Sequence, residues 1–77
     1  MNFEELENLI KENLKDATVE ISDLTGTGDH LGLSITSNEF KGKNLLAQHR
    51  MVMDILKEEL KDRLHAVKLK TQTYEQG

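Results

Sequence analysis

Three histidines, His30, His49 and His65, are the residues of this chain best suited to chemistry. A neutral imidazole binds transition metals and gains a charge near neutral pH, so each histidine is a candidate metal ligand. The 77 residues include no cysteine, which excludes a disulfide and a thiolate metal site.

Charge is unevenly distributed along the chain, whose net charge is −4. Residues 1–40 carry two lysines against nine acidic residues, whereas residues 41–70 carry eight Lys and Arg against four acidic residues. A domain that binds phosphate backbones is usually basic overall, so this balance counts against nucleic-acid binding. The basic segment forms either an ordinary solvated face or a contact surface for an acidic or phosphate-bearing partner. The candidate contact residues are Lys43, Arg50, Lys68 and Lys70.

Length and composition predict one small domain over residues 1–77, with a polar, frayed tail over residues 72–77. A domain of this size seldom encloses a deep catalytic pocket, and no residue has the sequence context of an activated nucleophile, so we expect no enzyme. The apolar stretches are too short to span a membrane, and the N-terminus shows no targeting peptide. We therefore expect a binding protein of the cytoplasm.

The hydrophobic pattern predicts an α+β fold in the order α-β-β-(short α)-α-β. Helical spacing indicates helices over residues 2–14 and 45–61, the second starting after the N-cap Asn44. Two-residue alternation indicates strands over 17–22, 30–36 and 64–71, the first two forming a hairpin through the Gly-rich stretch 25–29. Each strand has one apolar and one polar face, so the helices should cover only one side of a three-stranded sheet. A right-handed crossover through the long helix would set the third strand parallel to the second.

The long helix is predicted to pack through an apolar stripe about 100° wide. Its members are Leu45, His49, Val52, Met53, Leu56 and Leu60. His49 lies at the centre of this stripe, where a packed and hydrogen-bonded core histidine is more common than a metal ligand. We therefore assign a structural role to His49, to Phe40 as the anchor of the short helical turn, and to Gly42 as its end.

The element order and three groups of residues resemble the BolA family over nearly the whole chain. Residues 40–50, FKGKNLLAQHR, are similar to the family signature F-x-G-K-x-x-x-x-R-H-R, with Gln48 in place of the first arginine. Leu64-His65-Ala66-Val67 matches the family's last-strand motif, and the loop from Asp23 to His30 resembles that of one BolA subgroup. The resemblance implies a class II KH-like fold, with two layers and a three-stranded mixed sheet.

The resemblance to the BolA family also implies a partner. BolA proteins bind monothiol glutaredoxins and share a 2Fe-2S cluster with them, in iron–sulfur cluster trafficking or iron regulation. The chain alone would then be a monomer without a cofactor, and the partner of the heterodimer would supply a cysteine and glutathione. Rieske centres show that histidine is a competent ligand of such a cluster.

The resemblance assigns different roles to two of the histidines. His65 matches the family's cluster ligand. The alternative is a structural role, in which His65 caps the carbonyls at the end of the preceding helix. His30 is the candidate for the second ligand, and otherwise would be a solvent-exposed strand residue. Both ligand assignments are predictions from the family pattern.

The KH-like resemblance raises an alternative function, DNA-binding transcriptional regulation through residues 41–70. The sequence lacks two features of such binding. Gly42 is followed by Lys43, Asn44 and Leu45, so the G-x-x-G clamp of KH domains is missing. Phe40 lies outside the predicted strands, as does the tyrosine of the tail, so no aromatic side chain is placed to stack on bases. Glutaredoxin partnership is therefore the main prediction.

Overall fold

The computed structural model describes residues 3–24, 26, 30–62 and 66–74, and for residues 59–62 and 66 it describes the backbone alone. The elements are helix α1 (Phe3–Asn13), strand β1 (Thr18–Asp23), strand β2 (His30–Thr36), the 3₁₀ turn η1 (Asn38–Phe40), helix α2 (Leu45–Asp62) and strand β3 (Ala66–Gln72). This order confirms the α+β prediction from the hydrophobic pattern.

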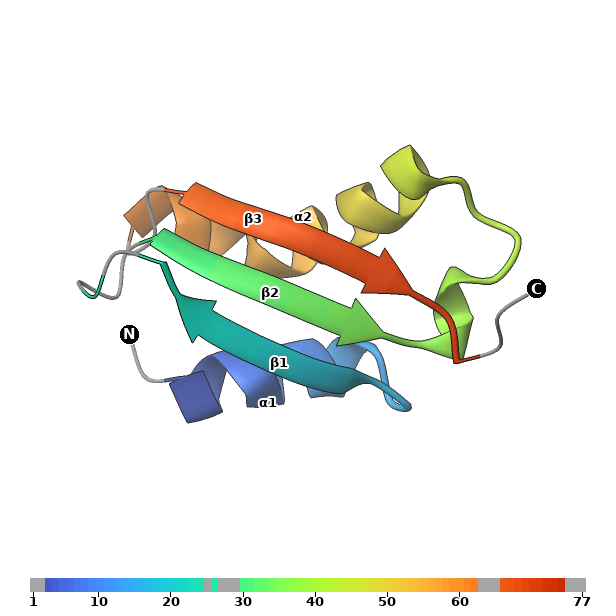
Figure 1. The fold of residues 1–77 in the computed structure, drawn as a ribbon, viewed down its shortest axis with the longest axis horizontal. Coiled ribbons are helices and arrows are strands. Elements are labelled where there is room, and N and C mark those ends of the chain that lie inside the picture. The colour runs from blue at the N-terminus through green and yellow to red at the C-terminus, as the bar shows by residue number, and fades with distance from the viewer. Residues whose placement is uncertain (1–2, 25, 27–29, 63–65, 75–77) are drawn as a thin grey trace.

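The three strands form one mixed sheet in the order β1-β2-β3. The central strand β2 runs antiparallel to β1, with which it forms a hairpin, and parallel to β3, which it reaches through α2. Both helices lie on the same side of the sheet, behind the strands in Figure 1. The sheet and its one-sided helical cover agree with the predicted class II KH-like architecture.

The core lies between the sheet and the helices because every second strand residue is apolar and faces them. On β2, Leu31, Leu33 and Ile35 are buried, whereas the residues between them are only partly buried. The helices and η1 complete the core with these buried side chains: Leu6, Ile10, Val52, Leu56 and Phe40. Among the residues that the structure describes, no helix covers the opposite face of the sheet (Figure 1).

The connection between β2 and α2 follows the local signals in the sequence. Phe40 is fully buried and anchors η1 in the core. Gly42 has a φ of +77°, in the left-handed region that favours glycine. The Asn44 side-chain oxygen accepts a hydrogen bond from the backbone N–H of Ala47 at 2.8 Å, which is the predicted N-cap of α2.

The predicted apolar stripe on α2 is wrong at two of its positions. Val52 and Leu56 are fully buried, but Met53 is 39% exposed and Leu45 is 60% exposed. Met53 follows Val52 by one residue, which turns it about 100° around the helix axis and away from the core. Leu45 lies in the first turn of α2, before the helix contributes its first buried residue. The Leu60 side chain lies outside the described residues.

The predicted frayed tail begins too early. β3 continues through Gln72, and the Gln72 side chain donates a hydrogen bond to Thr36 at 3.0 Å. The Tyr74 backbone N–H then donates to the Asn38 side chain at 3.1 Å. These polar residues are ordered because their hydrogen bonds join separate segments, which a hydrophobic pattern does not reveal. Within the described residues, no helix is both long and apolar enough to cross a membrane.

Candidate functional site

His30 is the first residue of β2 and lies on its uncovered face, together with Gly32 and Ser34. The His30 carbonyl accepts a hydrogen bond from the Leu24 N–H at 2.8 Å, which closes the hairpin with β1. The backbone of His30 is therefore fixed at the edge where the hairpin loop meets the sheet. Its side chain is partly buried.

The parallel pairing of β2 and β3 sets His30 opposite the first residue of β3. His65 itself lies outside the described residues. Ala66, which follows His65 in the sequence, pairs with His30 across the two strands. Neighbouring strands lie about 4.8 Å apart. One predicted ligand is thus directly opposite the residue that follows the other.

The hairpin loop is shaped by a glycine and an aspartate before it reaches His30. Gly26 has a φ of +80°, and a side chain added there would meet nothing within 4 Å, so its backbone conformation is what favours glycine. The Gly26 N–H donates to the Asp23 carboxylate at 2.9 Å, which forms an Asx-type turn. Asp29, the other oxygen donor of the loop, lies outside the described residues.

His49 lies on α2 and is half-buried. Its ring atom Nε2 is buried and has no hydrogen-bond partner among the described residues. The sequence predicts a packed and hydrogen-bonded histidine, and the structure supplies the packing without a hydrogen bond to Nε2. Within the same described part of the chain, no three His, Asp or Glu side chains come together as a metal site.

Gln48 joins three segments at the far end of the sheet. Its side-chain amide nitrogen donates to the Lys43 carbonyl at 2.8 Å, and its oxygen accepts from the Thr71 hydroxyl of β3 at 2.7 Å. The sequence marks Gln48 only as a departure from the family signature. The glutamine connects the loop before α2 to the last strand.

Asp16 is the centre of a second group of contacts at this end. The Ser37 hydroxyl donates to one carboxylate oxygen at 2.5 Å, and the Asn38 N–H donates to the other at 2.8 Å. These hydrogen bonds, that from Ser37 first, hold the pKa of Asp16 below its ordinary value. The Tyr74 hydroxyl donates to the Asp16 carbonyl at 2.5 Å. No local motif predicts these contacts, because their partners are far apart in the sequence.

Comparison with known proteins identifies the family. A sequence model described as BolA-like protein matches residues 6–76, which is nearly the whole chain. The chain belongs to the BolA family. The predicted membership of the family is thereby confirmed, whereas the assignment to one subgroup from the Gly-rich loop stays a prediction.

Several BolA relatives share both sequence and fold with this chain. The protein RP812 of Rickettsia prowazekii is 38% identical over 71 residues, which cover 92% of either chain. Its NMR structure, that of a BolA-like protein, aligns with a TM-score of 0.75 at 35% identity over 97% of both chains. BolA1 from Arabidopsis thaliana aligns with a TM-score of 0.87 at 27% identity, covering 96% of this chain and 93% of the other. The BolA domain of SufE1 from the same plant aligns with a TM-score of 0.83 at 28% identity, covering 92% and 90%.

The four basic residues predicted to contact a partner do not share one surface in this BolA fold. Lys68 and Lys70 of β3 line a hollow on the open face of the sheet. Arg50 lines another hollow, on α2, beside Leu46 and Met51. Lys43 lies in the exposed loop before α2, where its carbonyl accepts a hydrogen bond from the Gln48 side chain. The structure therefore brings together the two strand lysines and leaves Arg50 on a different element.

Proposed function

We propose that this BolA protein binds a monothiol glutaredoxin and shares a 2Fe-2S cluster with it, contributing the imidazoles of His65 and His30. The observation that carries the proposal is the pairing of His30 with Ala66, the residue next to His65. Two ligands of one iron must come from positions close enough to reach it. The register of Ala66 opposite His30 supports this proposal, because Ala66 is the sequence neighbour of His65.

The donor set of the chain suits a shared cluster. Histidine ligates one iron of Rieske 2Fe-2S centres, whereas the thiolates that hold the other iron must come from another molecule, since this chain has no cysteine. Replacing two thiolates by two neutral imidazoles also raises the reduction potential of a cluster. The complex should weaken in acid, because a protonated imidazole no longer binds metal.

The role that follows is cluster delivery or iron-dependent regulation by a binding protein rather than catalysis. The separation of Lys68 and Lys70 from Arg50 gives no continuous basic surface for a DNA duplex among these four residues. The geometry of the described residues thus supports a protein partner over the DNA-binding alternative.

The test is to mix the purified chain with a cluster-loaded monothiol glutaredoxin and to record visible absorption and circular dichroism. We expect a spectral change that saturates at equal amounts of the two proteins. His65→Ala and His30→Ala should weaken or abolish the change, whereas His49→Leu, which removes a histidine outside the proposed site, should keep it. An unchanged spectrum with the wild-type chain, or a wild-type response from His65→Ala, would refute the proposal.

A further inference from the structure

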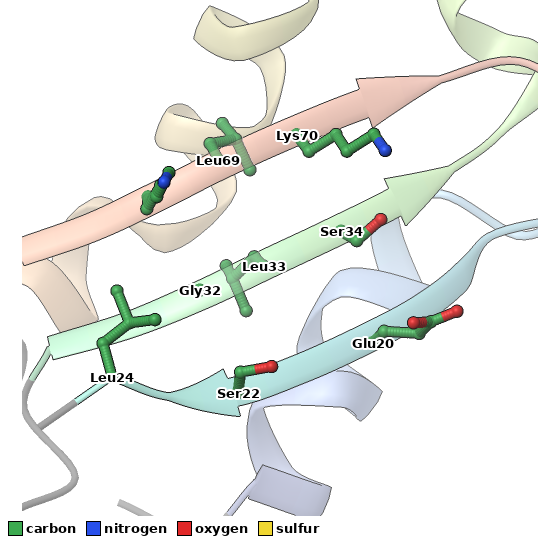
Figure 2. A pocket seen from close by; sticks show the side chains of 9 residues that line it. Glu20, Ser22, Leu24, Gly32, Leu33, Ser34, Leu69 and Lys70 are labelled. Atoms are coloured by element: carbon green, nitrogen blue, oxygen red, sulfur yellow. The ribbon is translucent and has the colours of Figure 1, made fainter. Parts of the chain in front are cut away.

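The open face of the sheet contains a hollow of about 240 Å³. It is lined by backbone and side chains of all three strands and of Leu24: Glu20, Ser22, Leu24, Gly32, Leu33, Ser34, Lys68, Leu69 and Lys70. Figure 2 shows the side chains that line this surface, and Figure 1 shows both helices behind the sheet. Because the hydrophobic core lies on the other side of the sheet, the hollow is available to a ligand from solvent.

Opposite charges lie on opposite sides of this hollow. The strand register sets Glu20 of β1, Ser34 of β2 and Lys70 of β3 in one row, and Figure 2 shows the three side chains on the same face. Lys68 follows in the adjacent row, beyond Gly32. The outer strands are about 10 Å apart, which is two interstrand spacings. Neither lysine forms an ion pair with Glu20 in the part of the chain that the structure describes.

Gly32 forms the floor of the hollow, although its backbone conformation does not require a glycine. Gly32 lies within the central strand and does not have a positive φ. A side-chain carbon added there would lie 3.3 Å from the Leu24 side chain, which is 54% exposed and forms an apolar wall. A glycine inside a strand weakens it, and often marks a place where a ligand approaches the backbone closely.

We propose that this hollow binds a short zwitterionic peptide, with its C-terminal carboxylate on Lys68 and Lys70 and its ammonium group on Glu20. The two serine hydroxyls and the bare backbone at Gly32 would contact the polar main chain between these ends. His30 lies on the same face only two residues before Gly32, about 7 Å along the strand. Glutathione is therefore the chosen probe, a choice that rests on the proposed function, in which the partner supplies it to the cluster.

The experiment is a titration of the ¹⁵N-labelled chain, without cluster or partner, with reduced glutathione, followed by NMR. We expect saturable shifts at the amides of Gly32, Ser34, Lys68 and Lys70. The double variant Lys68→Gln, Lys70→Gln should bind about tenfold more weakly, because two charge-assisted contacts are lost. Lys57→Gln, an exposed lysine on α2, is the matched control and should bind as the wild type does.

A second probe tests the charges of the ligand itself. Glutathione ethyl ester lacks one carboxylate, so it should bind the wild-type chain more weakly and should be less affected by the double lysine substitution. The inference is overturned if glutathione causes no saturable shifts at millimolar concentration, or if the double variant binds it as well as the wild type.

The cluster spectra separate this inference from the proposed function. A normal spectral change with glutaredoxin, together with a silent glutathione titration, refutes the peptide site alone. Saturable glutathione binding without any spectral change refutes cluster sharing alone and leaves the peptide site supported.

Discussion

At the end of the sheet where β2 finishes, hydrogen bonds that involve Asp16, Gln48 and Tyr74 connect five segments. These segments are the α1–β1 turn, η1, the start of α2, β3 and the residues after β3. The end where β2 begins carries His30, the turn at Gly26 and the register pair with Ala66. The first end uses its polar residues to fix the layers relative to one another. The second places the imidazole of His30 on backbone that the strands already hold.

Removing Phe40, the apolar anchor at the end of the sheet where β2 finishes, should have the largest effect on the free energy of unfolding. Phe40→Ala leaves a cavity beneath η1, where Phe40 is fully buried, and should lower the free energy of unfolding by about 3–5 kcal/mol. Urea denaturation followed by circular dichroism measures the change. The control Leu45→Ala, at a 60% exposed position nearby, should stay within about 0.5 kcal/mol of the wild type. Equal losses for both variants would contradict the assignment of Phe40 as the anchor.

Removing the charge of Asp16 should change how stability depends on pH. The lowered pKa means that the folded state favours the carboxylate, so its contribution is present above the ordinary value of 3.8 and is lost as pH falls through the lower folded pKa. Asp16→Asn should therefore lower Tm at neutral pH and lose less stability than the wild type on acidification through this window. Thermal melts at a series of pH values measure both effects. Parallel pH profiles for the two proteins would rule out this role of Asp16.

Removing the side chain of Gln48 should lower the free energy of unfolding by a smaller amount, because only two hydrogen bonds are lost. Gln48→Ala removes hydrogen bonds to the Lys43 carbonyl and the Thr71 hydroxyl, and should cost about 1 kcal/mol. A double-mutant cycle with Thr71→Val isolates the pair, because both single variants remove the same hydrogen bond. Urea denaturation of the four proteins gives the coupling. Strictly additive changes would show that the Gln48–Thr71 contact does not stabilise the fold.

Changing His30 should have the smallest effect on stability and a large effect on cluster sharing. His30→Ala keeps the backbone carbonyl that accepts from Leu24 and the pairing with Ala66, so the unfolding free energy should change by no more than about 0.5 kcal/mol. Urea denaturation and the glutaredoxin spectrum, measured on the same sample, separate the two properties. A variant that unfolds easily would place His30 among the structural residues and remove the contrast between the two ends.

The sequence predicts those parts of the molecule that depend on local physical rules. Alternation of apolar residues locates β2, a good capping residue locates the start of α2 at Asn44, and glycine at position 42 locates the left-handed corner. These features follow from side chains close in the sequence. The family motifs single out His30 and His65 as ligands, which stays a prediction, and the strand register adds that His30 lies opposite Ala66.

The remaining features depend on contacts between distant residues. The Tyr74 hydroxyl reaches the Asp16 carbonyl across 58 positions of the sequence, so the sequence pattern alone indicates a frayed tail. The exposure of Met53 follows from the rotation of α2 against the sheet, which a stripe about 100° wide does not determine. The hollow around Gly32 likewise appears only once the three strands are in register.

The most direct test of cluster sharing asks whether a histidine nitrogen of this chain binds iron. The chain is produced with ¹⁵N-labelled histidine, combined with an unlabelled, cluster-loaded monothiol glutaredoxin, reduced, and measured by pulsed EPR. We predict strong ¹⁵N hyperfine coupling to the cluster, which His65→Ala removes or reduces and His49→Leu leaves unchanged. A complex that retains the cluster without any such coupling would contradict histidine ligation by this chain.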